Sequence, residues 1–199
     1  MRKLLLIFIL VVGVARGDDE CAEDEVAVPG EEPTNVERKM PVKAGSGTCK
    51  DGWTRFERKN GVVVCLKAIR AQVTYNEAVN LCKNHQSQLF GIDSADELNY
   101  LKDNLGSIYV FIGAYRKKDC QFEASVLTTM PKCSSDKMFE FTDGVTKSNF
   151  LWFGKWSGGV PNSLFVDNEY ESAIVSIAGQ ILDVSSKSKL NGALCGTVA

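Results

Sequence analysis

The chain has 199 residues, of which 44% are hydrophobic and 24% are charged, and its formal net charge is −2. This length suits one domain of roughly 150 residues with extensions. Residues 49–199 hold sixteen acidic and seventeen basic residues with no basic stripe, which argues against a nucleic-acid partner.

Residues 1–17 have the pattern of a secretory signal peptide. Arg2 and Lys3 precede an apolar run from Leu4 to Val14, and Ala15-Arg16-Gly17 has the small-x-small form of a cleavage site. The run is short for a transmembrane span, and no second long apolar run follows it. We therefore expect a secreted, extracellular protein with no membrane span; a signal anchor is the alternative.

Residues 18–48 form an acidic segment. It contains nine acidic residues, three basic residues, three prolines and no aromatic residue. Such a segment cannot bury enough apolar surface to order itself, which predicts a disordered leader or linker. Cys21 lies in it and either forms an interchain disulfide that makes a homodimer or remains a capped thiol.

The other six of the seven cysteines predict a disulfide framework, as expected of a secreted chain. Spacing alone allows fifteen ways of pairing them. They are Cys49, Cys65, Cys82, Cys120, Cys133 and Cys195.

A hairpin is predicted at the start of the domain. Asn60-Gly61 is a strong turn signal, and Val62–Leu66 follows it as a return strand. Cys49 and Cys65 could close the base of this hairpin.

Two amphipathic helices follow, each with a predicted capping box. The first box is Thr74-x-x-Glu77 and the second is Ser94-x-x-Glu97, with Gly106 as the stop of the second helix. Helical spacing brings two sets of apolar residues onto inward faces: Tyr75, Ala78, Val79 and Cys82 on the first helix, and Leu98, Leu101 and Leu105 on the second.

The run Val110–Arg116 is predicted to be a buried strand around which the other elements are arranged, because it is short, apolar and bounded by polar residues. Gly113 within it indicates close approach of another backbone. Further on, we expect a surface loop between Cys120 and Cys133, and a short strand at Phe139–Phe141.

From Val145 to Asn168 the sequence has no periodicity, which predicts an ordered but irregular loop. The segments 172–177 and 180–184 flank Ala178-Gly179 as a hairpin. The fold is expected to end at Leu194-Cys195-Gly196.

In order and spacing these features resemble the C-type lectin-like domain, and are most similar to secreted nematode members of that family. The resemblance covers residues 49–199 and implies an α+β fold: two helices packed on small antiparallel sheets, with a long irregular binding loop. It rests on Cys49-x-x-Gly52-Trp53, Glu77-Ala78 with Cys82, Phe111–Ala114, Phe141–Gly144, Trp156, Pro161-Asn162, Leu182–Val184 and Cys195.

The resemblance also implies three disulfides. Cys82 pairs with Cys195, Cys49 with Cys65, and Cys120 with Cys133 as an extra bridge in the loop. A further disulfide that is usual in the family is replaced here by Ser172 and Ser186.

The calcium and sugar site of the family is degraded in this sequence. The expected ligand triplet is Val160-Pro161-Asn162 and the expected ligand pair is Leu182-Asp183, so two oxygen ligands have become aliphatic. Asn162, Asp183 and one of Glu169 or Glu171 remain as candidates. Calcium requires six to eight oxygens, so we expect no cofactor, or calcium held only weakly.

The leading hypothesis is a secreted, non-enzymatic recognition module whose glycan or protein ligand is met by residues 150–171. Trp152 and Phe153 are expected to be exposed for contact with the ligand, and Trp156 to belong to the core. One alternative is calcium-dependent carbohydrate binding through Asn162, Glu169 and Asp183. Another is a disulfide-linked structural or interaction protein. Family analogy suggests innate defence.

No catalytic residue is predicted. His85 is the one histidine, three residues after Cys82, and a Cys-His nucleophile pair would need that cysteine free. The resemblance places Cys82 in a disulfide, and no metal-binding spacing of His or Cys is present.

Overall fold

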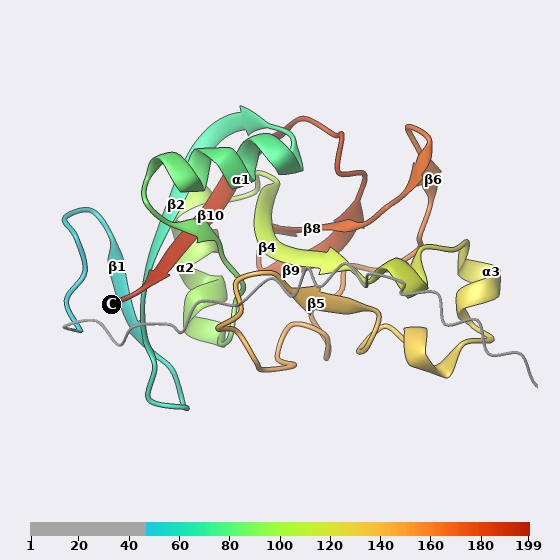
Figure 1. Ribbon diagram of the computed structural model, residues 1–199, viewed down its shortest axis with the longest axis horizontal. Coiled ribbons are helices and arrows are strands. Elements are labelled where there is room, and N and C mark those ends of the chain that lie inside the picture. Colours follow the sequence, from blue (N-terminus) through green and yellow to red (C-terminus); the bar gives the residue numbers. More distant parts are fainter. Residues whose placement is uncertain (1–46) are drawn as a thin grey trace, which may run out of the picture. The chain divides into compact units, whose positions relative to one another are not determined.

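The computed structural model describes residues 47–199, so the predicted signal peptide, the acidic leader except its last two residues, and Cys21 lie outside the described residues. Three α-helices accompany ten strands in this part of the chain (Figure 1). In chain order the elements are β1 (Thr54–Glu57), β2 (Val63–Val73), α1 (Tyr75–Asn84), β3 (Gln88–Leu89), α2 (Ala95–Leu105), β4 (Val110–Arg116), α3 (Ala124–Leu127), β5 (Phe139–Phe141), β6 (Phe165–Val166), β7 (Glu169–Tyr170), β8 (Ala173–Ile177), β9 (Gln180–Val184) and β10 (Leu190–Val198). None of the helices within residues 47–199 is long and apolar enough to cross a membrane.

Eight strands form one hydrogen-bonded sheet. Its order is β1-β2-β10-β4-β8-β9, with β3 paired to β10 and β5 paired to β4. The β10–β4 pair is parallel and the others are antiparallel. The last strand, β10, therefore lies in the middle of the sheet, where it pairs with β2 from the start of the domain.

The central strand β4 contributes to both sides of the sheet, because side chains alternate along a strand. Val110, Ile112 and Ala114 pack in the core that contains the buried leucines of α2. Phe111 packs in the second core, with Ala78 of α1. The two helices thus cover opposite faces, and the prediction of a buried central strand is confirmed.

Both helices begin where the sequence predicts. Thr74 and Glu77 form the reciprocal capping box of α1. Ser94 caps α2, but the second half of the predicted box is wrong. The Glu97 carboxylate accepts from the Asp93 amide and forms a buried ion pair with Arg58. The sequence analysis did not predict this arginine, which takes the carboxylate that the capping box would have used.

Backbone contacts explain Gly113. A Cβ atom at this position would lie 2.3 Å from the carbonyl oxygen of Leu89, so only glycine fits beside the end of β3. The three implied disulfides are present: Cys49–Cys65, Cys82–Cys195 and Cys120–Cys133. The α+β, disulfide-stapled fold is thus confirmed.

Candidate functional site

A buried arginine lies at the base of the long loop, where the sequence predicted the remnant of a calcium site. Arg116 ends β4, and both its side chain and that of Asp183 in β9 are fully buried. Its Nη2 donates to Asp183 Oδ2 at 2.6 Å, and its Nε donates to the Glu171 carbonyl oxygen at 2.7 Å. The guanidinium also lies 4.6 Å from the centre of the Phe139 ring.

Asp183 ties this cation to the long loop. Its carboxylate also accepts the backbone N–H groups of Asn162 at 3.3 Å and Ser163 at 3.0 Å. Asn162 and Asp183, which the sequence analysis grouped as calcium candidates, are therefore brought together. The positive charge beside them comes from the protein itself.

The residues at this position do not fit a calcium ion. Asp183 already pairs with a guanidinium, and Val160 and Leu182 supply no side-chain oxygen. Glu169 lies elsewhere, because its carboxylate accepts from the Ser185 hydroxyl at 3.0 Å and the Ser186 amide at 2.6 Å. Within residues 47–199 no group of three or more His, Cys, Asp or Glu side chains could hold a metal ion.

The acid that does lie near the pair is Glu171. Its carboxylate accepts from the Leu164 amide at 3.3 Å. Burial and the negative charge of Asp183 raise the pKa of Glu171 to about 7. Burial opposes ionisation of Glu169, but hydrogen bonds from Ser186 and Ser185 outweigh it and lower the pKa of that residue. The two acids that the sequence could not tell apart thus have different surroundings.

The expected exposure of Trp152 is wrong. Trp152 is buried at 7% exposure, and its ring stacks on Phe139 and Phe141 of β5, with ring centres 5.7 and 5.0 Å apart. The loop folds back over β5, so the indole enlarges the core. Trp156 stacks on Trp152 and packs against the same core, as expected. Phe153 is exposed at 59%, also as expected.

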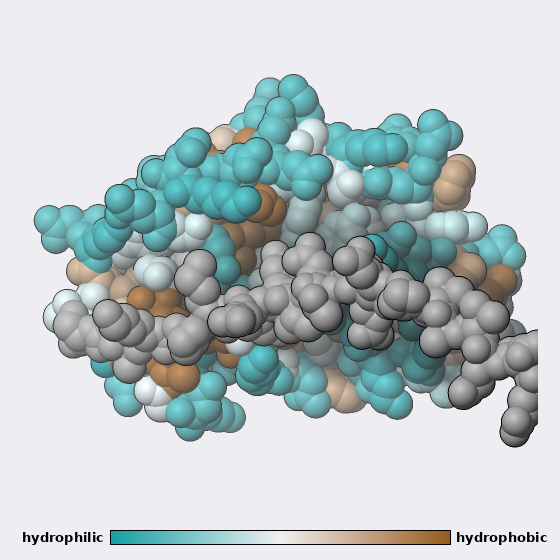
Figure 2. All heavy atoms as spheres, in the orientation of Figure 1, coloured by the Kyte–Doolittle hydropathy of each residue, from teal (hydrophilic) through white to brown (hydrophobic). Residues whose placement is uncertain are grey.

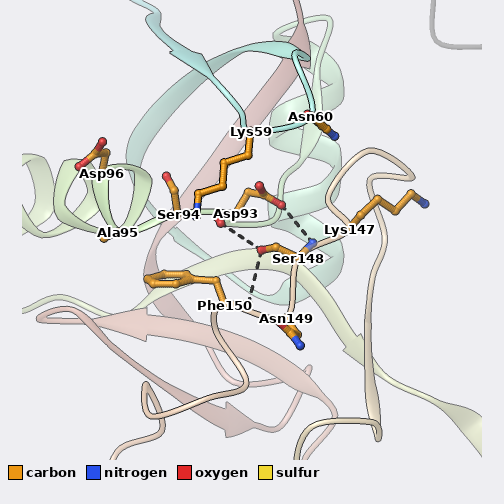
Figure 3. Close-up of a pocket in the computed structure, with 10 residues that line it drawn as sticks. All are labelled: Lys59, Asn60, Asp93, Ser94, Ala95, Asp96, Lys147, Ser148, Asn149 and Phe150. Carbon is orange, nitrogen blue, oxygen red and sulfur yellow. Dashed lines mark hydrogen bonds between the residues drawn. The ribbon is translucent and has the colours of Figure 1, made fainter.

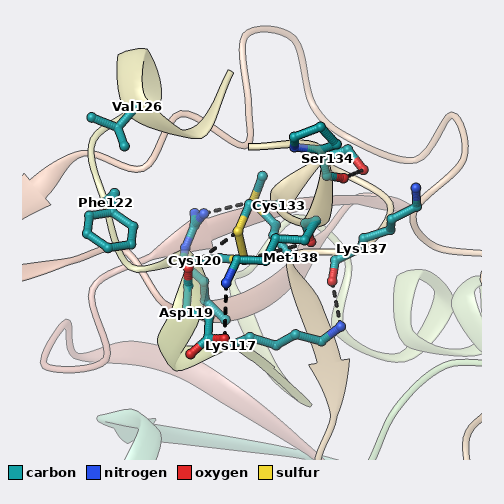
Figure 4. The surroundings of a disulfide bond; sticks show 12 residues. Lys117, Asp119, Cys120, Phe122, Val126, Cys133, Ser134, Lys137 and Met138 are labelled. Carbon is teal, nitrogen blue, oxygen red and sulfur yellow. Dashed lines mark hydrogen bonds and ion pairs between the residues drawn. A yellow bond between two sulfur atoms is a disulfide. The ribbon is translucent and has the colours of Figure 1, made fainter. Parts of the chain in front are cut away.

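Apolar side chains are exposed instead near the end of the long loop and on the loop between Cys120 and Cys133, which we call the stapled loop. Together they make what we call the apolar loop surface: Phe122, Val126, Leu164, Phe165 and Val166, of which Phe165 is 62% exposed. The two loops adjoin, because the Ser163 hydroxyl donates to the Phe122 carbonyl oxygen. Figure 4 shows Phe122 and Val126 beside the Cys120–Cys133 disulfide that fixes their segment. In Figure 2, brown and tan residues appear at this end of the molecule in separate small areas near α3 and β6 of Figure 1, with hydrophilic residues between them.

An apolar cavity of about 360 Å³ opens in the same region. It is lined by residues of the stapled loop and of the segment that follows it, with Pro161 of the long loop on one side: Ala124, Leu127, Thr128, Met130, Pro131, Cys133, Ser134, Ser135 and Met138. A cavity beside exposed aromatic and aliphatic side chains can receive an anchoring side chain of a partner.

Sequence reasoning missed Arg116 and the stapled-loop half of the apolar loop surface. Arg116 did carry a signal, because an arginine that ends a buried apolar strand must find a counter-charge. Phe122 and Val126 carried none, since their exposure depends on how the stapled loop folds.

The sheet joined by its last strand, helices on opposite faces, and a long loop folded at one end define a C-type lectin-like domain. Residues 54–199 match the family described as C-type lectin domain-containing protein 141/158, and the chain belongs to this family. No curated protein matches the chain.

Solved structures share the fold at low sequence identity. The carbohydrate-recognition domain of cow CD23 is 19% identical with a TM-score of 0.53, covering 77% of this chain and 98% of its own. That of the mouse scavenger receptor C-type lectin is 19% identical with a TM-score of 0.53, covering 76% and 98%. A calcium-independent type II antifreeze protein is 18% identical with a TM-score of 0.53, covering 76% and 96%.

Proposed function

We propose that this protein is a non-enzymatic recognition module that binds an extracellular protein without calcium, through the apolar loop surface. The observation that carries the proposal is this surface itself. Five exposed apolar side chains lie on two segments that one hydrogen bond joins at this end of the domain. Exposed apolar surface gathered in one region marks interaction sites on soluble proteins.

A protein partner fits this surface better than a sugar. The cluster offers phenylalanine, leucine and valine side chains, and its neighbouring cavity of about 360 Å³ is lined mostly by apolar residues. Protein interfaces are anchored by a few apolar side chains that enter such cavities. A sugar needs several hydrogen-bonding groups, which this surface lacks.

Calcium independence is supported by the Arg116–Asp183 pair. The guanidinium bonds the Asp183 carboxylate and the Glu171 backbone, so it joins β4, β9 and the long loop in the way a bound cation would. Catalysis is disfavoured since Cys82 is in a disulfide and cannot act with His85 as a nucleophile.

Secretion fits the three disulfides, which persist in oxidising compartments. A role in innate defence rests on family analogy. A homodimer through Cys21 stays a separate prediction, which non-reducing electrophoresis of Cys21→Ser tests.

Two experiments test the proposal. Calorimetric titration with calcium should be flat, and chelator should leave the thermal melt unchanged; a melting shift abolished by Asp183→Asn would contradict calcium independence. An array of extracellular proteins should then be probed with the wild type, Phe165→Ser, and Tyr109→Ser. Tyr109 is exposed at 39% and lies outside the apolar loop surface, so its variant is the matched control.

We expect binding that survives chelator, is lost in Phe165→Ser and is kept in Tyr109→Ser. Binding that needs calcium, or that Phe165→Ser and Leu164→Ser leave intact, would refute the proposed surface. Absence of any reproducible protein ligand would also count against it.

A further inference from the structure

The sequence contains two Asn-Gly pairs, Asn60-Gly61 and Asn191-Gly192. Asparagine is among the chemically labile residues of proteins. It reacts most readily before glycine, because glycine has no Cβ atom to keep its backbone nitrogen away from the preceding side chain. Both pairs share this chemistry, so the fold decides which of them can react.

Asn60 and Gly61 lie in the turn between β1 and β2. The Arg58 backbone N–H donates to the Val62 carbonyl oxygen at 2.9 Å, and the Gly61 N–H donates to the Arg58 carbonyl oxygen at 2.8 Å. Asn60 and Gly61 are both exposed, and a Cβ atom at Gly61 would have no heavy atom beyond its chain neighbours within 4 Å. The Gly61 nitrogen is thus held by a turn bond in open space, where water can reach it and release it to react.

The Asn60 side chain is folded over the Gly61 peptide. Its Oδ1 accepts from the Val62 amide at 3.1 Å, which makes an Asx turn that spans Gly61. The accepted bond draws electrons from Asn60 Cγ, so this carbon becomes a better target for a nucleophile. Figure 3 shows Lys59 extending toward Asp93, whereas the Asn60 side chain points away from it, at the rim of a cavity of about 710 Å³. The amide nitrogen of Asn60 can therefore leave into solvent.

The second Asn-Gly pair is locked in the centre of the sheet. Gly192 in β10 is buried, and it pairs with Arg70 of β2 on one side and with Val110 of β4 on the other. A Cβ atom at Gly192 would lie 3.1 Å from the Ile69 carbonyl oxygen. Reaction of an Asn-Gly pair forms a five-membered ring, which needs space and a change in the direction of the backbone. The sheet provides neither, so this pair is protected.

From this contrast we infer that Asn60 is a site of spontaneous modification, at which the asparagine becomes aspartate and isoaspartate. The Gly61 nitrogen loses its proton and attacks Asn60 Cγ, the C–N bond of the side-chain amide breaks, and ammonia leaves with a proton from solvent. The product is a five-membered cyclic imide. Water then opens one of its two carbonyl groups: one opening gives aspartate, and the other gives isoaspartate, in which the main chain runs through the side chain. No electron is transferred, and water is the one co-reactant.

The modification acts next to a buried polar network that joins this turn to α2 and the long loop. The Arg58 guanidinium forms two bonds of 2.8 Å with the Glu97 carboxylate and donates to the Thr146 hydroxyl at 2.9 Å. Both products add a negative charge beside Lys59, and isoaspartate adds one atom to the main chain two residues after Arg58. Isoaspartate should therefore displace Arg58 and weaken the network. The inference is independent of the proposed protein partner, because residues 58–62 and the apolar loop surface share no residue.

The test follows both sites in the folded, disulfide-bonded protein during incubation at mildly alkaline pH. After reduction, cleavage after glutamate separates residues 58–77, which contain Asn60, from residues 172–199, which contain Asn191. Mass spectrometry then measures conversion of amide to acid, and fragmentation locates isoaspartate. We expect at least about tenfold more conversion at Asn60 than at Asn191, because the sheet must open locally before Asn191 can react. In guanidinium chloride with the disulfides reduced, the two sites should convert at similar rates.

Asn60→Ser is the matched control, because serine keeps a side-chain oxygen for the Val62 amide but cannot form the imide. Its melting temperature should not change during the incubation. Asn60→Asp adds the charge without the longer main chain, so freshly prepared it should melt above the incubated, isoaspartate-rich wild type. The inference is overturned if the folded protein converts Asn191 as fast as Asn60, or if folding protects Asn60 as well as Asn191. An incubated wild type that melts like Asn60→Asp would refute the displacement of Arg58.

Discussion

Replacement of Arg116 by methionine should strongly destabilise the domain. Methionine fills much of the arginine volume and suits the apolar neighbours Met138 and Phe139, so the variant isolates the loss of charge. It leaves the Asp183 carboxylate fully buried, with only two neutral N–H donors, from Asn162 and Ser163. Removal of one partner of a buried pair costs about 3–5 kcal/mol.

That loss is a large part of the ~5–15 kcal/mol by which a domain is usually stable. At ~2–4 °C per kcal/mol for a domain of this size, the melting temperature should fall by roughly 6–20 °C. Urea unfolding followed by tryptophan fluorescence measures the free energy directly. Arg70→Met is the control, because Arg70 is exposed and should tolerate the change within about 1 kcal/mol.

The double variant Arg116→Met/Asp183→Asn distinguishes an uncompensated charge from lost packing. Asparagine keeps one oxygen to accept a loop amide, so the double variant should be more stable than the sum of the single effects by about 1–3 kcal/mol. If Arg116→Met unfolds like Arg70→Met, or if the two single losses simply add, the guanidinium does not hold the loop and the reasoning fails.

Three further predictions follow from the site and the core. Because the folded pKa of Glu171 is about 7, above its ordinary value, its contribution to stability is present at acid pH and lost as pH rises through about 7. In urea unfolding, the free energy of unfolding of Glu171→Gln relative to that of the wild type should therefore increase from about pH 5 to about pH 8, whereas that of the exposed control Glu140→Gln should not. A difference between Glu171→Gln and the wild type that stays constant with pH would contradict this. Trp152→Ala should cost about 3–5 kcal/mol in the same assay, and a near-neutral result would restore Trp152 as a surface residue. Gly113→Ala should lower the melting temperature sharply, since the added Cβ meets the Leu89 carbonyl oxygen at 2.3 Å; a wild-type melt would refute this contact.

Much of the fold was predictable because its signals are local. The capping box at Thr74, the Asn60-Gly61 turn and the apolar run of β4 each depend on residues within one element. The disulfides came from a resemblance over the whole domain and are confirmed. The capping role given to Glu97 failed, because a distant arginine competed for its carboxylate.

The candidate site was predictable only in part. The resemblance to the family grouped Asn162 with Asp183 and implied that Val160 and Leu182 stand where ligand oxygens are expected. It could not choose between Glu169 and Glu171, because a difference of two residues in an irregular loop decides which acid faces Asp183.

The sequence by itself determined the helices, the turns and the central strand, since these follow from residue type and spacing along the chain. The loss of calcium ligands was implied by the resemblance to the family. Only the tertiary structure decided that Arg116 supplies the cation, that Trp152 is core, and that Arg58 bonds both Glu97 and Thr146. The physical reason is that the polar contacts join residues 39 to 88 positions apart, while the indole packs on β5, outside its own irregular loop. Only the packed sheet brings these charges and rings together.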